Sequence, residues 1–412
     1  MRFARFPARH LWVALFPAVA LCCGLAFAGE APARLDELVK EALANNPDIR
    51  ASLQRWKSSR AVIPQVQTLP DPKVTLGYRD MERQDVMYGL SQEIPFPGKL
   101  GLKGEIAARE SDRMEQDYLA TQLAVVARLK EVFYDLHFVH ESIRVLRQTR
   151  RLLQEFEQTA NARYAAGQAQ QQDVLRAQTE ILRLLARLAT LEQRRQSLHA
   201  DINRLLSRLP GDPVGMPEEL QFTPVRHSLV ELNALLDQTS PLLRGQQRTV
   251  EQGSQAIALA EREYYPDFEI SALGLRDPVM KTDGYQVMVN VTIPLYYATR
   301  QREGVHEAVA SREAVFQDLQ ALRLELLARI KDNVAQAERA EQLITLLRDA
   351  IIPQSRLTLA SVQVSYAVGK VDFLTLLNSL LTLQENELEF HGEMVEHEKA
   401  VARLEGILGV AP

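Results

Sequence analysis

Four short stretches of the chain alternate apolar and polar residues with a period of two. The clearest stretch carries Tyr285, Val287, Val289 and Val291 on one face and polar residues on the other. Together the four stretches cover about 73–80, 85–95, 267–276 and 284–295. This spacing predicts two β-hairpins. The alternation fits either a half-buried sheet or a sheet with lipid on one face and water on the other.

Each predicted β-hairpin leads into a helical region of unusual length. Apolar residues recur at steps of three and four from Leu119 to Leu146, and again from Val174 to Leu209, which is a heptad seam. Neither glycine nor proline occurs between Glu105 and Ala166. At 1.5 Å per residue, one helix here would be about 100 Å long. We therefore predict two long helical hairpins, over 99–209 and 298–409.

The chain contains an internal duplication. The segment LPDPKV is echoed by YPDFEI, Ile94-Pro95 by Ile293-Pro294, and RYAAG by SYAVG, each about 200 residues later. A stretch rich in proline and glycine, PGDPVGMPEELQFTP, separates the copies. We predict four parts, namely a signal peptide at 1–28, a first repeat at 29–209, a linker at 210–224 and a second repeat at 225–412.

The first 28 residues have the features of an export signal. Three arginines precede an apolar run, and Ala26-Phe27-Ala28 matches an A-x-A-like cleavage site. Both cysteines, Cys22 and Cys23, lie inside this signal, so we expect no disulfide and no cysteine-based metal site in the mature chain. Removing the three arginines changes the net charge from −5 to −8, and an acidic exported protein is a poor nucleic-acid binder.

Aromatic residues fall toward both ends of the predicted strands. Tyr88 and Tyr285 lie toward the hairpin turns, whereas Phe268 and Tyr296 lie at the opposite ends. Two aromatic belts separated by an aliphatic band are typical of a bilayer-spanning sheet. Four strands cannot close a barrel, and lipid does not tolerate open strand edges. The pattern therefore predicts an oligomer that pools the strands of several chains.

The strand-to-helix segment SQEIPFPGKL and the two turn segments, ARYAAGQAQQQDVLRAQ and SYAVGKVDFLTLLNS, carry a family resemblance. With the duplicated architecture, they resemble the TolC family of outer-membrane efflux ducts. The IPFPGK form is most similar to the heavy-metal branch, which serves cobalt–zinc–cadmium and copper–silver pumps. The resemblance implies a mainly α fold with a small β part, in which a homotrimer forms a 12-stranded membrane β-barrel continued by a periplasmic α-helical tunnel.

The resemblance also implies a function and partners. We expect a passive exit duct in the outer membrane of a Gram-negative bacterium, extending into the periplasm and contacting outer-membrane lipid. It would export metal ions or small toxic compounds delivered by a periplasmic adaptor and an inner-membrane pump of the resistance-nodulation-division type. One alternative is a type I secretion channel. Another is a periplasmic adaptor, although adaptors carry one helical hairpin inserted in β-rich domains and this chain has two.

No constellation of residues in the sequence indicates catalysis, so we expect neither an enzyme nor a cofactor. His137 and His140 stand three residues apart on a predicted helix, which is compatible with metal binding, but no third ligand accompanies them. His391 and His397 form a looser cluster with two glutamates near the C-terminus. We predict ordinary helix-surface histidines at both places, with a metal site at the second cluster as the alternative.

The segments that join the strands to the long helices are the first candidate functional region. Pro95 and Pro97 cannot donate hydrogen bonds to a sheet, so strand pairing stops there, and Gly98 permits a sharp change of direction. Pro294 takes the corresponding place in the second copy. The helices begin with four cations that would meet lipid headgroups at the inner leaflet or simply be solvated, namely Lys99, Lys103, Arg300 and Arg302.

The turns between the long helices are the second candidate region. Gly167 and Gly369 permit tight turns that would meet the adaptor, together with Arg163, Tyr164 and Tyr366. By resemblance, Asp173 and Asp372 would line the periplasmic entrance as rings of a trimer. Their alternative role is to cap a helix N-terminus. Thr375 stands where some relatives have a further acid, which argues against strong cation selectivity.

Overall fold

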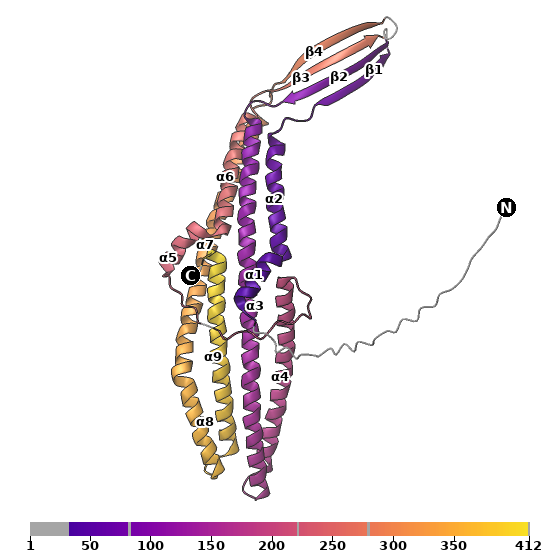
Figure 1. Ribbon diagram of the computed structural model, residues 1–412. Coiled ribbons are helices and arrows are strands. Elements are labelled where there is room, and N and C mark those ends of the chain that lie inside the picture. Colours follow the sequence, from indigo (N-terminus) through magenta and orange to yellow (C-terminus); the bar gives the residue numbers. More distant parts are fainter. Residues whose placement is uncertain (1–32, 81–83, 221, 278–280, 411–412) are drawn as a thin grey trace, which may run out of the picture.

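A small sheet stands at one end of a long bundle of helices (Figure 1). The computed structural model describes residues 33–80, 84–220, 222–277 and 281–410. The predicted signal peptide lies outside the described residues. Within them, no helix is both long enough and apolar enough to span a membrane.

The sheet has four antiparallel strands in the order β1-β2-β3-β4. Their bounds are β1 (Lys73–Asp80), β2 (Gln84–Ile94), β3 (Asp267–Asp277) and β4 (Thr282–Thr292). β2 and β3, which belong to different copies of the repeat, pair with Leu90 opposite Ala272. The two edge strands, β1 and β4, each have one neighbour among the described strands. The sheet therefore presents two open edges.

One face of the sheet is apolar and exposed to solvent in the single chain. Leu76 is 79 % exposed, Val287 67 % and Tyr285 91 %. The other face is mixed, because it carries polar residues such as Thr75 and Asn290 beside four large apolar side chains, Met87, Leu273, Leu275 and Met288. A strongly exposed apolar face marks a surface that another partner covers.

Helices make up most of the other described residues. They are α1 (Leu35–Asn45), α2 (Pro47–Gln67), α3 (Lys99–Ala165), α4 (Gln171–Leu206), α5 (Leu229–Thr239), α6 (Pro241–Arg262), α7 (Gln301–Leu346), α8 (Ile352–Ala367) and α9 (Phe373–Leu408). A π-helical turn, η1 (Leu347–Ile351), connects α7 to α8. α3 has 67 residues and is therefore about 100 Å long.

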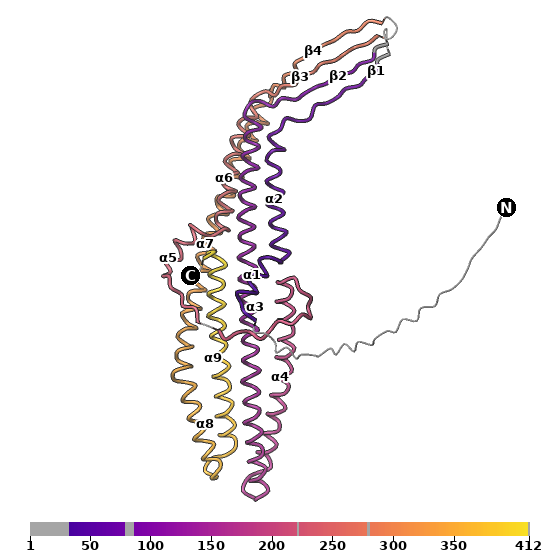
Figure 2. Tube along the Cα trace, viewed as in Figure 1, coloured from indigo at the N-terminus to yellow at the C-terminus, as the bar shows by residue number. Residues whose placement is uncertain are grey.

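α3 runs from the sheet to the opposite end of the bundle (Figure 2). It contacts α2 and α6 in the half near the sheet and α4 and α9 in the other half. Its buried side chains recur at helical spacing, as at Leu129, Phe133, Leu136 and Ile143. Buried residues lie on several sides of α3, which contacts helices of both repeats, so α3 is the axis on which both repeats pack.

Local sequence signals set several helix ends. The Asn46 side chain accepts hydrogen bonds from the amides of Asp48 and Ile49, and Pro47 occupies the first position of α2. α5 begins with a capping box between Ser228 and Glu231.

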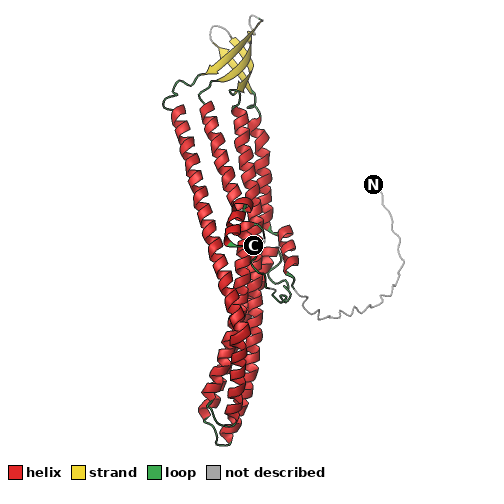
Figure 3. Ribbon diagram, turned by 90° about the vertical axis from the view of Figure 1, so that its left-hand side faces the viewer, coloured by secondary structure: helices red, strands yellow, loops and turns green. Residues whose placement is uncertain are grey.

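The buried residues form three clusters along the bundle rather than one compact core. One lies where α1, α3 and α4 meet, around Leu136 and Ile202. A second fills the half away from the sheet, around Leu153 and Phe373, and a third joins α5 to α7 and α9. Figure 3 shows the resulting shape, with the sheet at one end and the helical turns at the other.

The second repeat departs in two places from the expected pattern of strands followed by a regular helical hairpin. β4 ends at Thr292, three residues before the expected strand end, because Pro294 cannot donate to the sheet and residues 295–300 form turns. The helix begun by α7 changes to π-helical geometry at η1, immediately before Pro353. A proline inside a helix removes one hydrogen bond, and a π-helical turn accommodates that loss.

Candidate functional site

The first candidate site is the junction between β2 and α3. β2 ends at Ile94, and the chain passes through Pro95 and Pro97 to Gly98, which has φ of +95°. This left-handed conformation favours glycine and lets the chain change direction sharply as it leaves the sheet and enters α3. The Phe96 amide donates a hydrogen bond of 2.7 Å to Asp267 Oδ1 at the start of β3, and the Phe96 ring stacks on Tyr265 with centroids 4.6 Å apart.

Lys99 lies at the centre of this junction. Its side chain is only 3 % exposed, and its ammonium lies 2.9 Å from Asp267 Oδ2 and 3.3 Å from Glu263 Oε2. It also donates to the Tyr265 carbonyl at 3.3 Å. A buried charge needs partners of this kind. The Lys99 ammonium therefore interacts with these protein groups rather than with solvent.

This burial corrects the expectation that Lys99 contacts lipid headgroups. The other three cations expected at this level, Lys103, Arg300 and Arg302, have exposed side chains. Arg302 forms an ion pair of 2.9 Å with Glu303. The structure therefore separates one buried, structural lysine from three surface cations.

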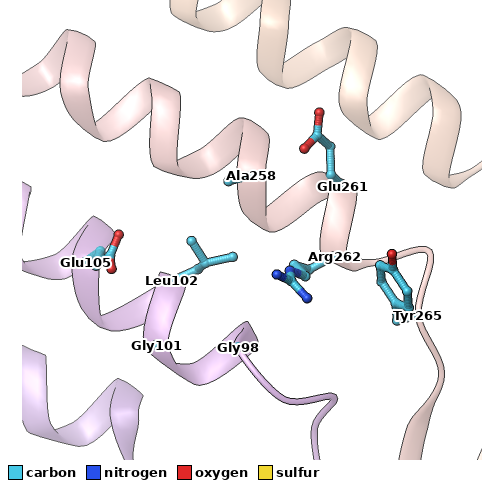
Figure 4. A pocket seen from close by; sticks show the side chains of 8 residues that line it. All are labelled: Gly98, Gly101, Leu102, Glu105, Ala258, Glu261, Arg262 and Tyr265. Carbon is cyan, nitrogen blue, oxygen red and sulfur yellow. The ribbon is translucent and has the colours of Figure 1, made fainter.

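A pocket of about 550 Å³ opens beside the junction, between the start of α3 and the end of α6 (Figure 4). Its lining includes Gly98, Glu105 and Arg262. The Arg262 side chain extends between the two helices in Figure 4, and a Cβ at Gly98 would lie 3.7 Å from its guanidinium carbon. The charged groups of the lining are the carboxylates of Glu105 and Glu261 and the guanidinium of Arg262. Because charges of both signs are present, the lining does not favour ligands of one charge.

The corresponding junction of the second repeat is more exposed. Pro294 follows the end of β4, and the turn before α7 carries Leu295, Tyr296 and Tyr297, which are 75 %, 77 % and 60 % exposed. No lysine equivalent to Lys99 follows, since residue 298 is alanine. Within one chain, buried side-chain contacts therefore hold the first junction, whereas the second junction is largely exposed.

The second candidate site comprises the two helical turns at the far end of the bundle. Gly167 has φ of +74° and Gly369 has φ of +78°. The Gly167 amide donates to the Tyr164 carbonyl at 2.9 Å, and the Gly369 amide donates to the Tyr366 carbonyl at 3.0 Å. Both helices therefore end in the same left-handed glycine turn.

Arg163 connects the two turns. Its Nη1 donates to the Tyr366 carbonyl, and its guanidinium lies 4.8 Å from the centre of the Tyr366 ring. Tyr366 is 3 % exposed and meets Phe373 edge to face. Burial raises the pKa of Tyr366, and the nearby charge of Asp173 raises it further while Arg163 lowers it. The tips of the two hairpins are thus held together within one chain.

The two candidate gate acids belong to these neighbouring tips. Asp372 is the N-cap of α9, where its Oδ1 accepts the Thr375 amide at 2.9 Å. The hydrogen bonds from the Thr375 hydroxyl and amide lower the pKa of Asp372, and the positive charge of Arg176 on α4 contributes further. Asp173 lies in the first turn of α4 and is half-buried. The capping role of Asp372 is therefore present, and it leaves the carboxylate exposed.

His137 and His391 share a neighbouring carboxylate, Glu141, whose charge acts on both rings. His137 Nδ1 lies 3.2 Å from the Glu218 carbonyl, and His391 lies 3.4 Å from Glu141. His397 is buried and stacks on Phe222 with ring centres 4.3 Å apart. Across the described part of the chain, no group of three or more potential ligands is arranged to hold a metal ion.

The sequence indicated several of these residues but missed their contacts. Glu263, Tyr265 and Asp267 were not predicted as partners of Lys99, although Tyr265 and Asp267 lie in the duplicated YPDFEI segment. The signal that could have found Asp267 is its repetition as Asp71. The pairing of Arg163 with Tyr366 joins residues 203 positions apart, and no local pattern predicts it.

A sheet with an exposed apolar face at the end of a helix of about 100 Å defines an elongated, mainly helical protein rather than a compact domain. The chain belongs to the outer membrane efflux protein family, whose model matches residues 38–208 and 233–410. The prediction of an efflux protein located in the outer membrane and extending into the periplasm is thereby confirmed.

Individual relatives agree with this assignment. The chain is 20 % identical over 394 residues to the cobalt-zinc-cadmium resistance protein CzcC of Cupriavidus metallidurans, covering 92 % of this chain and 90 % of the relative. The outer-membrane channel OprN superposes with a TM-score of 0.81 at 18 % identity, covering 91 % and 89 % of the two chains. CusC superposes with a TM-score of 0.80 at 14 % identity and 92 % coverage of each. These likenesses confirm the mainly helical fold with a small strand part.

Proposed function

We propose that the protein is the passive outer-membrane exit duct of a tripartite efflux system, working as a homotrimer. Three four-stranded sheets would close into a 12-stranded barrel, and the helices of three chains would enclose a periplasmic tunnel. The observation that carries this proposal is the combination of an exposed apolar face with two open edges on one sheet. Lipid covers such a face only if the edges are paired, which requires further copies of the chain.

The helices support the same assembly. α4 exposes Leu175 and Leu182, 53 % and 66 % accessible, and α8 exposes Leu357 and Val364, 66 % and 68 % accessible. Each pair is spaced by one heptad, so each helix carries an outward apolar stripe in addition to the seam inside its own hairpin. The α4 stripe of one copy would pack on the α8 stripe of the next.

The helical tips would receive the periplasmic adaptor. Gly167 and Gly369 lie at exposed turns, and Tyr164 beside the first turn is 44 % exposed. Arg163 and Tyr366 hold the two tips of one chain together, so that they present one surface. We propose Asp173 and Asp372 as acids that line the entrance, where three-fold symmetry would bring like charges together. An inner-membrane pump of the resistance-nodulation-division type would supply the cargo.

We propose metal ions as the cargo, because the relative CzcC is a cobalt-zinc-cadmium resistance protein. A strain lacking this gene should tolerate several-fold less cobalt, zinc or cadmium, and the wild-type gene should restore tolerance. Unchanged metal tolerance together with greater sensitivity to organic toxicants would instead assign small toxic compounds to the duct. Loss of a secreted protein with unchanged tolerance to both would indicate type I secretion.

A further inference from the structure

The linker between the repeats lies across helices of both repeats. Its described residues between 218 and 223 are called the strap below. On α3, in the first repeat, His137 Nδ1 lies 3.2 Å from the Glu218 carbonyl. On α9, in the second repeat, Glu398 Oε1 accepts a hydrogen bond of 2.9 Å from the Thr223 amide. The strap therefore ties one repeat to the other.

The helix side chains that hold the strap are buried. His137 is 8 % exposed, and Glu398 is 2 % exposed. Phe222 of the strap stacks on the buried ring of His397. Leu220 packs against the buried cluster that includes apolar residues of α3. Because the strap contacts these groups directly, lifting it would expose them to water.

A cluster of charges lies one helical turn from His137, where α3 and α9 meet. Glu141 Oε2 lies 2.6 Å from Arg144 Nη2 on the same helix and 3.4 Å from His391 Nε2 on α9. Arg144 Nη2 lies 3.3 Å from His391 Nε2. A guanidinium has donors but no acceptor, so His391 Nε2 accepts this hydrogen bond in its unprotonated form.

Protonation changes the charge balance at this contact. With both rings neutral, Arg144 balances the charge of Glu141. A proton on His391 Nε2 removes the hydrogen bond from Arg144 and places two cations in contact. A further proton on His137 leaves the Glu141 carboxylate to balance three cations.

Two more acids face the rings without changing this balance. The charge of Glu219, on the strap, acts on His137, and the charge of Glu387, on α9, acts on His391. Glu219 is exposed, so water screens its charge. Glu387 already forms an ion pair of 2.7 Å with Arg356.

We propose that His137 and His391 make the strap sensitive to acid, so that it lies across α3 and α9 at neutral pH and lifts as both rings gain protons. This inference concerns contacts within one chain. It rests neither on the proposed assembly nor on the proposed cargo.

The direction of the pH dependence follows from the surroundings of the rings. Burial lowers the pKa of His137 and of His391, and the charge of Glu141 opposes this effect at both rings. Arg144 lowers the pKa of His391 further. Rings exposed to water regain the ordinary histidine pKa of about 6.5. The lifted form therefore binds more protons than the closed form, and the closed form loses stability as the pH falls below about 6.5.

Glu141 stays charged over the same range. Burial would raise the pKa of Glu141, but the hydrogen bond from Arg144 and the charges around it hold that pKa below its ordinary value. Mild acid therefore adds positive charge to the two rings and leaves the carboxylate ionised.

Hydrogen exchange followed by mass spectrometry tests this proposal on the full-length protein in detergent. The reporter is the peptide containing Thr223, whose amide is bonded to the buried Glu398. Labelling times are scaled to the intrinsic exchange rate at each pH. Protection of this peptide should fall between about pH 7.5 and about pH 5.5, by up to about ten-fold for each ring. Protection of α2 serves as the internal reference.

Two substitutions remove the titration and keep polar groups near the same positions. His137→Asn keeps a donor near the place of Nδ1, and His391→Gln keeps a carboxamide near the place of Nε2. The double variant should keep its protection at about pH 5.5. His306→Gln is the matched control, because His306 is exposed near the start of α7 and pairs with Glu303 there. This control should lose protection as the wild-type protein does.

Each outcome decides for or against the proposal. A strap that stays protected in the wild-type protein at about pH 5.5 would overturn it. The same loss of protection in the double variant would assign the effect to other groups and would also overturn it. If the double variant loses its helical circular dichroism at neutral pH, His391→Gln alone is tested. Its loss of protection should be several-fold smaller than that of the wild-type protein, and an undiminished loss would overturn the proposal.

Discussion

At the scale of single residues, one buried lysine fixes the junction between strand and helix. Lys99 meets three oxygen acceptors, and Asp267 accepts from both the Lys99 ammonium and the Phe96 amide. These contacts join the end of β2 in the first repeat to the start of β3 in the second. A charged side chain at the expected membrane level therefore acts inside the protein rather than on lipid.

Replacing Lys99 with methionine should destabilise this junction. The substitution keeps an unbranched side chain, one atom shorter, but leaves Asp267 and Glu263 without the cation that they share. We expect a loss of about 2 kcal/mol, less than for a fully buried pair because both acids are partly exposed. Thermal unfolding followed by circular dichroism should show a lower Tm. The control Lys103→Met removes an exposed charge, and an equal fall in Tm there would refute the special role of Lys99.

Asp372 allows the charge and the helix cap to be separated. Asp372→Asn keeps a capping oxygen and deletes the charge, whereas Asp372→Ala deletes both. If the carboxylate lines the entrance, both variants should lose cation preference in planar bilayers, and only the alanine variant should also lose stability. Unchanged ion selectivity in Asp372→Asn would leave the residue as a helix cap only.

The pH dependence of Asp372 has a defined sign. Hydrogen bonds from Thr375 lower the pKa of the carboxyl in the folded protein. Its contribution to stability is therefore present above the ordinary carboxyl pKa and is lost as the pH falls through the lowered value. Cation preference carried by this carboxylate should accordingly be present at neutral pH and be lost on acidification, at a pH that rises if the trimer brings like charges close together. Asp372→Asn should remove this pH dependence, and an unchanged pH profile in that variant would contradict the assignment to this carboxylate.

At the scale of secondary-structure elements, the two glycine turns are alike in backbone but differ in surroundings. A Cβ at Gly167 would meet nothing within 4 Å, whereas one at Gly369 would lie 3.0 Å from Arg163 Nη2. Substituting valine at either position forces a β-branched residue into a left-handed conformation, which costs roughly 1–2 kcal/mol or more. At Gly369 the substitution also displaces the arginine that joins the two tips.

We therefore expect Gly369→Val to impair efflux more than Gly167→Val, while both variants still reach the membrane as trimers. Resistance assays and immunoblots of membrane fractions would measure the two effects. Gly304→Val provides a control, because Gly304 lies in α7 without positive φ and with open space around its Cβ position. Equal activity of the two tip variants would argue against the contact between Arg163 and Tyr366 as a functional link.

Whether a segment forms a helix or a strand could be predicted from the sequence where one hydrophobic period extends over many residues. The seam from Val174 to Leu205 packs within the bundle, whereas Leu209 lies beyond the end of α4 and is 73 % exposed. The π-helical turn η1 was not predicted, because the apolar spacing that was used does not change when a helix shifts by one hydrogen-bond step. Pro353 was the local signal for it.

At the scale of the whole molecule, the duplication made the architecture predictable. Repeated segments, two alternating strand pairs and two long helical tracts together indicated the family without any long-range contact. The contacts themselves were not predictable, since Phe96 meets Asp267 and Arg163 meets Tyr366 across 171 and 203 residues. Such pairs are set by how the repeats pack on α3 and have no counterpart in local periodicity.

We propose that several copies of this chain form one duct in the outer membrane. The most direct measurement is the protein mass, by light scattering with detergent subtracted, of material extracted from isolated outer membranes. A mass of three chains, from the outer-membrane fraction, is the result we predict. A monodisperse single chain recovered from the soluble periplasmic fraction would rule out such an assembly.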